Sequence, residues 1–119
     1  MKVGGELMAK VANSLLITKE DNLYRISMTP ELQDVLGNIA YIDFTEEDNI
    51  DVDDSLLNLE SSKAVMELTS PLAGTIVSRN DEASANPDLL NQTDASKNWI
   101  VLLDNVDQAA FDALDNAKN

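Results

Sequence analysis

Cysteine and histidine are both absent from this chain of 119 residues. The protein therefore has no thiol nucleophile, no imidazole general base, no thiolate metal centre and no disulfide. Basic residues are also scarce, with 8 against 22 acidic ones and a formal net charge of −14. This excess of negative charge repels phosphate backbones and anionic membranes and favours partners with basic docking surfaces. We expect no nucleic-acid partner, no membrane partner and little chemistry from the chain's own side chains.

Long apolar runs are missing as well. No run approaches the roughly 20 residues of a membrane span, and the chain shows no secretory signal pattern. These features predict a cytoplasmic protein. The length predicts one domain at residues 11–119, and residues 1–10 are expected to be a flexible tail or an expression remnant.

Short strand-like runs separated by turn residues predict an all-β fold with short helices. The region 11–17 begins to look strand-like, and 15–18 and 23–27 flank a turn at 20–22 and predict a first hairpin. Further strands are expected at 39–44, 55–59, 65–69, 74–77 and 99–103.

Three segments have helical signals. In the first, Thr29 is expected to cap a helix at 30–36, with Leu32, Val35 and Leu36 on its buried face and Gly37 ending it. Asn86 and Pro87 are expected to start a second short helix. A stripe of apolar residues predicts a C-terminal helix that packs on the domain: Val106, Ala110 and Leu114, with Phe111 beside them.

The acidic segment from Thr45 to Asp54 could in principle bind a hard cation through Asp48, Asp51, Asp53 and Asp54. A calcium loop opened by Asp51 would need glycine at its sixth position and glutamate at its twelfth. Leu56 and Ser62 stand there instead. We therefore expect a solvated, self-repelling loop and no metal.

Lys63 stands between two strand-like runs, in the segment Glu60-Ser61-Ser62-Lys63-Ala64. Strand, polar turn and strand predict a hairpin with the lysine at its tip. A primary amine on a flexible stem can attack an activated carboxyl group once a partner enzyme removes its proton. An exposed lysine that only keeps the surface solvated is the alternative interpretation of this residue.

Four segments in this order resemble the successive signatures of the glycine cleavage system H protein family. They are Glu60-Ser61-Ser62-Lys63-Ala64, Ser70-Pro71-Leu72-Ala73-Gly74, Asn86-Pro87-Asp88-Leu89-Leu90-Asn91 and Asn98-Trp99-Ile100-Val101. The resemblance implies a barrel-sandwich hybrid, like other lipoyl and biotinyl carriers, with lipoate in amide linkage to Lys63. It also implies a non-enzymatic carrier that is the substrate of a lipoate–protein ligase. Glu60, three residues before the lysine, would then help the ligase to recognise the hairpin. Ser61, Ser62 and Ala64 would matter through small size and turn shape.

Two other classes stay open at this point. A biotin carrier is possible by fold, but the biotin pattern has methionine on both sides of the lysine, and here the neighbours are Ser62 and Ala64. An unmodified module that binds a partner through its acidic surface is the other. The intact mass of the protein separates all three.

The chain departs from ordinary H proteins at its N-terminal part, which is shortened and lacks the His-Glu-Trp-like signature that helps to shield an aminomethylated arm. Asp53 also stands at a turn position usually held by glycine. The shortened form resembles H-like proteins linked in some microbes to a sirtuin-class ADP-ribosyltransferase and a macrodomain hydrolase. That resemblance implies a lipoate relay to other lipoyl-dependent enzymes or a redox response, with lipoylation permitting a second modification by ADP-ribose. Asp34 is the predicted acceptor, and an ordinary solvent-facing helix residue is the alternative interpretation. Service as an aminomethyl carrier with the glycine cleavage components remains the alternative function.

Overall fold

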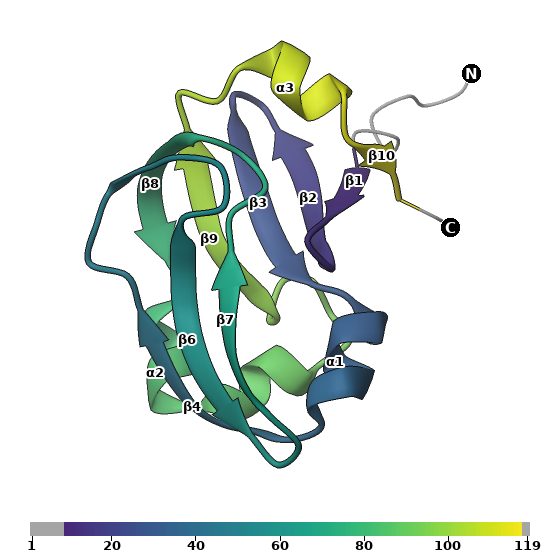
Figure 1. The fold of residues 1–119 in the computed structure, drawn as a ribbon, viewed down its shortest axis with the longest axis vertical. Helices are drawn as coiled ribbons and strands as arrows, with labels where there is room; N and C mark the ends of the chain where they lie inside the picture. The colour runs from purple at the N-terminus through teal and green to yellow at the C-terminus, as the bar shows by residue number, and fades with distance from the viewer. Residues whose placement is uncertain (1–8, 118–119) are drawn as a thin grey trace.

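The structure, a computed structural model, describes residues 9–117 and contains two antiparallel sheets that face each other (Figure 1). The seven-stranded sheet has the order β10-β1-β2-β3-β9-β8-β5. Its strands, in sequence order, are β1 (Ala9–Ala12), β2 (Leu15–Glu20), β3 (Leu23–Met28), β5 (Asn49–Ile50), β8 (Gly74–Arg79), β9 (Trp99–Asp104) and β10 (Asp115–Asn116). The three-stranded sheet has the order β4-β6-β7 and comprises β4 (Ile39–Phe44), β6 (Ser55–Ser61) and β7 (Val65–Thr69). The predicted all-β barrel-sandwich architecture is confirmed.

The core lies between the two sheets. Along β6, Leu57 and Leu59 are buried while Asn58 and Glu60 point to solvent, as expected for a strand with one face on the core. Leu15 and Ile17 alternate in the same way on β2. Fully burying each such side chain stabilises the fold by roughly 1.5–3 kcal/mol. The other face of the three-stranded sheet is exposed to solvent and has both polar and apolar side chains. The hairpin that contains Lys63 belongs to this sheet.

The predicted first hairpin is confirmed by the pairing of β2 with β3, and Asp21 in its turn has φ 58°. The strand-like interpretation of residues 11–17 is wrong in one respect. Asn13 and Ser14 both have positive φ, 55° and 64°, and form a two-residue turn between β1 and β2. Positive φ at both central residues is the conformation that tight hairpins require.

Helix α1 (Pro30–Leu36) begins and ends as predicted: the hydroxyl of Thr29 accepts a hydrogen bond from the amide of Leu32, and Gly37 follows with φ 68°. Leu32 and Leu36 are buried, but Val35 is 57% exposed, so its place on the buried face was wrong. At about 100° per residue, Val35 lies about 80° from the centre of the Leu32–Leu36 stripe. A helix of two turns covers only a narrow stripe of the core.

Two short helices connect β8 to β9: α2 (Asp81–Ala85) and the 3₁₀ helix η2 (Pro87–Asn91). The prediction of a helix starting at Pro87 is correct in place, although it is 3₁₀ and the Asn86 side chain makes no capping hydrogen bond. Helix α2 was not predicted. Both helices lie beside β4 and cover that edge of the three-stranded sheet.

The C-terminal helix α3 (Gln108–Asp112) is shorter than the apolar stripe predicted, and Val106 and Leu114 lie outside it. The stripe nevertheless packs on the core, with Phe111 fully buried. Beyond α3, β10 pairs with β1 at the edge of the larger sheet. Ala9 and Lys10 of the expected tail are therefore strand residues, and the rest of that tail lies outside the described residues. Within residues 9–117, none of the helices is long and apolar enough to cross a membrane.

Candidate functional site

The tip of the β6–β7 hairpin is held by Ser61. The Ser61 amide donates to the carbonyl of Ala64 at 2.8 Å, and the Ser61 hydroxyl donates to the same oxygen at 3.0 Å. That hydroxyl also accepts from the amides of Lys63 (3.3 Å) and Ala64 (3.1 Å). Ser62 and Lys63, at the end of this hydrogen-bonded turn, are both exposed. The predicted position of the lysine at a hairpin tip is therefore what the structure shows.

The hairpin tip rests on the end of helix α1. The amide of Ser62 donates to the carbonyl of Asn38 at 2.8 Å, and the amide of Asn38 donates to the Ser62 hydroxyl at 3.1 Å. Gly37 makes this close approach possible, because a Cβ there would lie 2.5 Å from the Ser62 hydroxyl oxygen. The hairpin tip is thus a braced platform, although sequence reasoning found neither Asn38 nor the contact with Gly37.

The side chain of Lys63 runs over the same helix end. Its Nζ donates to the backbone carbonyl of Asp34 at 3.1 Å, across 29 positions of sequence. A positive charge is favourable at the C-terminal end of a helix, where unpaired carbonyls carry partial negative charge, and the last turn of α1 has no basic residue of its own. The structure therefore brings together two residues that the sequence singled out for separate reasons.

Glu60 is exposed on the outer face of the three-stranded sheet, directly opposite Tyr41 on one neighbouring strand and Val65 on the other. Its carboxylate is free to meet a partner beside the tip. Ala64 is half-buried against the core, so a larger side chain there would disturb the packing as well as the turn.

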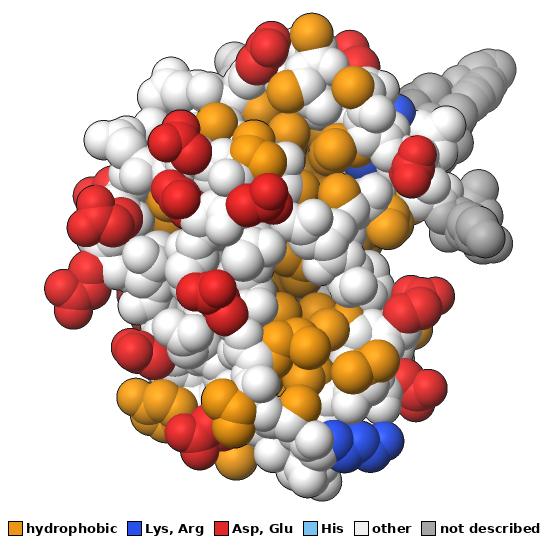
Figure 2. Space-filling view, viewed as in Figure 1, with side chains coloured by type: hydrophobic (Ala, Val, Ile, Leu, Met, Phe, Trp, Pro, Cys, Tyr) orange, Lys and Arg blue, Asp and Glu red, His pale blue; other side chains and the backbone are white. Residues whose placement is uncertain are grey.

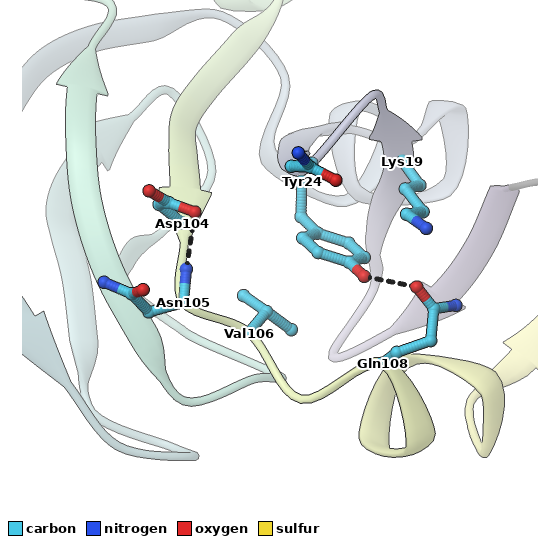
Figure 3. A pocket seen from close by; sticks show the side chains of 7 residues that line it. Lys19, Tyr24, Asp104, Asn105, Val106 and Gln108 are labelled. Atoms are coloured by element: carbon cyan, nitrogen blue, oxygen red, sulfur yellow. Dashed lines mark hydrogen bonds between the residues drawn. The ribbon is translucent and has the colours of Figure 1, made fainter.

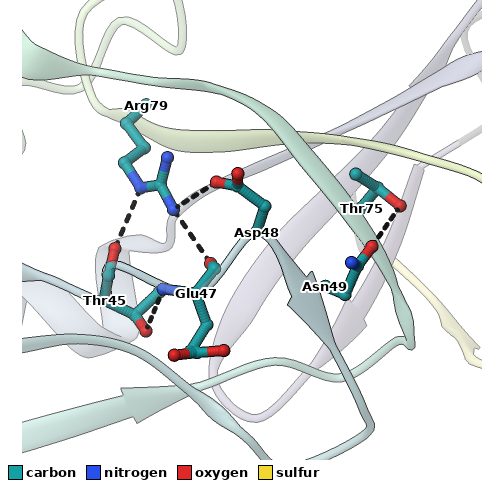
Figure 4. Close-up of polar contacts among 6 residues, drawn as sticks. All are labelled: Thr45, Glu47, Asp48, Asn49, Thr75 and Arg79. Carbon is teal, nitrogen blue, oxygen red and sulfur yellow. Dashed lines mark hydrogen bonds and ion pairs between the residues drawn. The ribbon is translucent and has the colours of Figure 1, made fainter.

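The acidic segment before β6 is organised by one arginine (Figure 4). Arg79 donates to the carbonyls of Thr45 and Glu47, and its guanidinium lies 3.0 Å from a carboxylate oxygen of Asp48. Within residues 9–117, no group of three or more acidic side chains could hold a metal ion. Asp53 has φ 70°, which explains why its turn position favours glycine.

Lys63 lines neither of two hollows on the surface formed by residues 9–117. A pocket of about 280 Å³ lies over Tyr24, whose hydroxyl donates to Gln108 at 2.8 Å (Figure 3). Burial, and then the charges of Asp112 and Asp107, raise the pKa of Tyr24 above its usual value. A groove of about 670 Å³ lies between the β1–β2 turn, the start of α1 and β10.

Three kinds of comparison with known proteins agree on one family. The family model described as glycine cleavage H-protein matches residues 9–119. The chain belongs to the glycine cleavage H-protein family. Within that family, a glycine cleavage system H-like protein of Staphylococcus aureus is 44% identical over 110 residues, covering 92% of this chain and all of the relative. A glycine cleavage system H protein of Oceanobacillus iheyensis is 32% identical and covers 87% of this chain and 82% of its own length.

The crystal structure of a glycine cleavage system H protein from Mycobacterium marinum superposes with a TM-score of 0.72 at 21% identity, covering 85% of this chain and 84% of that one. This likeness shows the fold. Members of the H-protein family are carriers and not catalysts, and they hold lipoate in covalent linkage to a lysine. The family also works with a lipoate–protein ligase and with glycine cleavage components.

Proposed function

We propose that this chain is an H-like lipoyl carrier that bears lipoate on Lys63. The observation that carries the proposal is the exposed Lys63 amine on a hairpin braced by Ser61 and Asn38. The residues fit the group, because Ser62 and Ala64 are small and leave the amine open to an approaching active site. Once bound, the lipoyl group supplies a dithiolane whose sulfurs carry acyl groups or electrons.

The residues of the chain itself act by placement. For attachment, the Lys63 amine loses a proton and attacks the carboxyl carbon of an acyl adenylate, so that a C–N bond forms and AMP leaves. The rigid hairpin then holds the flexible arm at the surface, which keeps its local concentration high at each partner. Glu60, beside the tip, is proposed to contribute to recognition by the ligase.

Intact mass tests the attachment site. Protein from lipoate-fed cells is expected to gain the mass of one lipoyl group, and Lys63→Arg is expected to gain none. Lys97→Arg, which also changes an exposed lysine to arginine, is the matched control and should gain the group as the parent does. An unmodified parent, or a Lys63→Arg variant that still gains the mass, would refute the assignment.

A second modification is proposed at Asp34, by ADP-ribose from a sirtuin-class transferase and with removal by a macrodomain hydrolase. The contact that supports it is the hydrogen bond from the Lys63 ammonium to the Asp34 carbonyl. Amide formation removes the lysine charge from this helix end. An enzyme that binds the side chain of Asp34 would therefore also contact Lys63, and its binding would depend on whether Lys63 is lipoylated. In the reaction, a carboxylate oxygen would bond to the ribose anomeric carbon of NAD, and nicotinamide would leave.

Site mapping after incubation with the transferase and NAD tests this step. We expect labelling of the lipoylated protein, weak labelling of the unlipoylated protein and no labelling of Asp34→Ala. Glu31→Gln, one turn earlier on the exposed side of α1, should label as the parent does. Unchanged labelling of Asp34→Ala would reject the acceptor.

Lipoate relay to other lipoyl-dependent enzymes, or a redox response, is the role that we propose for the loaded arm. The 44% identity to an H-like relative, against 32% to an H protein, supports it. Because the chain is also similar to the H protein of Oceanobacillus iheyensis, aminomethyl transfer is the second candidate function. Incubation of the lipoylated protein with glycine decarboxylase and glycine separates them: an aminomethylated product would establish glycine cleavage, and its absence together with lipoyl transfer to another carrier would establish relay.

A further inference from the structure

The outer face of the three-stranded sheet has a distinctive pattern next to the hairpin tip. Tyr41, Glu60 and Val65 form one row across β4, β6 and β7, because each lies directly opposite the next. Val65 is 82% exposed and Tyr41 is 54% exposed, and they are two of the five large apolar side chains that residues 9–117 leave open to solvent. Val65 follows Lys63 by two positions in the sequence, and Tyr41 lies on β4, at the opposite edge of the sheet. Exposed apolar surface rimmed by polar residues is a feature of protein–protein interaction sites, and this end of the sheet has such surface on both sides of one carboxylate.

The next row away from the tip is polar. Asp43, Asn58 and Glu67 are paired across the same three strands, and all three are exposed. None of the three strands contains a lysine or an arginine. The face therefore combines an apolar patch near the tip with negative charge on and behind it, and this combination matches a partner with an apolar centre and a basic rim.

The other flank of the tip is occupied. Helix α1 meets the tip through the Ser62–Asn38 hydrogen bonds, and the Lys63 ammonium rests on its last turn. An active site that closes around Nζ thus has the outer face of the sheet as its open approach. Figure 2 shows acidic side chains scattered over the side of the molecule that it draws, with very few basic side chains among them.

We propose that the outer face of the β4-β6-β7 sheet, centred on Tyr41, Glu60 and Val65, is the docking surface for the enzyme that acylates Lys63. The enzyme's apolar contact covers Tyr41 and Val65, and its basic side chains face Glu60 and the second row. This inference rests on the proposed lipoyl function and adds to it the surface through which the lysine is chosen. It also explains selection of one lysine, because none of the other lysines within residues 9–117 lies on the β4, β6 or β7 strands or in the turn between β6 and β7.

Acylation kinetics test the surface. With purified lipoate–protein ligase, lipoate and ATP, Val65→Asp is expected to lower kcat/KM for acylation about tenfold, since a charge replaces a central apolar contact. Val77→Asp places the same change at a 51% exposed valine in β8 of the other sheet, and its rate should stay within about twofold of the parent. Val65→Ile, which keeps an apolar side chain at this position, is expected to be acylated at the parent rate. Equal rates for Val65→Asp and Val77→Asp, with both variants folded by circular dichroism, would overturn the proposal.

Competition separates docking from chemistry. Lys63→Arg cannot be acylated but keeps the face, so an excess of it should inhibit acylation of the parent. The double variant Lys63→Arg/Val65→Asp should inhibit far less. Similar inhibition by both would show that the ligase docks elsewhere.

Charge reversal tests the rim. Asp43→Lys/Glu67→Lys is expected to slow acylation, whereas Glu82→Lys/Asp115→Lys, with the same net charge but both changes outside this sheet, is expected not to. If all these face variants are acylated normally yet fail to pass the lipoyl group to a later partner, the face belongs to that partner and the assignment is wrong. A parent that is never acylated on Lys63 would refute the lipoyl function itself, which the kinetic comparison alone cannot do.

Discussion

Gly37 is the residue on which the position of the lysine depends most directly. Its φ of 68° and ψ of −145° lie in a region that is essentially restricted to glycine, and its missing side chain leaves the space filled by the Ser62 hydroxyl. The residue that ends α1 is therefore also the one that lets the hairpin tip rest on the helix end. Gly37 thus determines both the end of α1 and the position of the Lys63 amine.

Gly37→Ala should both destabilise the protein and misplace the tip. Backbone strain of this kind costs on the order of 1–3 kcal/mol, and the new Cβ must also displace Ser62. We expect a lower free energy of unfolding in urea and slower acylation of Lys63. Asn38→Ala is the control, because its contacts with Ser62 use only the Asn38 backbone. An unchanged acylation rate in a destabilised Gly37→Ala would show that the brace does not position the amine.

Tyr24 gives the fold a defined response to alkaline pH. Its pKa is raised in the folded protein, chiefly by burial. The unfolded chain therefore loses the proton first as the pH passes about 10, and the stability that this tyrosine contributes is intact below that pH and lost above it. Between about pH 9 and pH 11, Tyr24→Phe should lose less unfolding free energy than the parent. Identical pH slopes for Tyr24→Phe and the parent would contradict the assignment.

At the scale of elements, the sequence predicted the features for which a clear capping or turn pattern is present. Thr29, Pro30 and Gly37 predicted both ends of α1, and the polar tip at Ser61–Lys63 predicted the lysine hairpin. One strand and the exposure of one residue depend on distant partners, which the sequence pattern does not show. Strand β10 exists because it pairs with β1 at the other end of the chain, and the exposure of Val35 depends on which side of α1 meets the sheets.

The site divides in the same way. Lys63, its turn and the strands around it follow from local pattern and resemblance, but its contact with Asp34 joins positions 29 residues apart and required the fold. The row of Tyr41, Glu60 and Val65 also needed the strand register, because a shift of one residue would bury these side chains and expose the leucines. Alternation along one strand shows which residues face outward, but not which residues on neighbouring strands they meet.

Helix α3 is predicted to stabilise the domain out of proportion to its five residues. Phe111 is fully buried, and its ring centre lies 5.0 Å from that of Tyr24 on β3. Phe111→Ala is expected to cost about 3–5 kcal/mol of unfolding free energy. Val106→Ala, at a partly buried position before the same helix, should cost clearly less. Thermal and urea unfolding measure both, and equal small effects would mean that the C-terminal segment is not docked on the core.

At the scale of the whole molecule, the net charge of −14 acts on stability and on association in opposite ways. Like charges spread over one small domain repel one another, so the folded state is destabilised by its own field. The same field attracts a basic partner from a distance. Acylation of Lys63 removes one positive charge and strengthens both effects slightly.

Salt should therefore raise the stability of this protein while it lowers its rate of acylation. The screening length falls from about 30 Å at 0.01 M to about 8 Å at 0.15 M ionic strength, which weakens self-repulsion and partner attraction together. We expect Tm to rise over this range and kcat/KM for the ligase to fall, through slower association. Asp43→Lys/Glu67→Lys should show a flatter salt dependence of kcat/KM than Glu82→Lys/Asp115→Lys, although their net charges are equal. If the two slopes agree, the attraction is a property of total charge alone, and the face beside Lys63 has no special part in it.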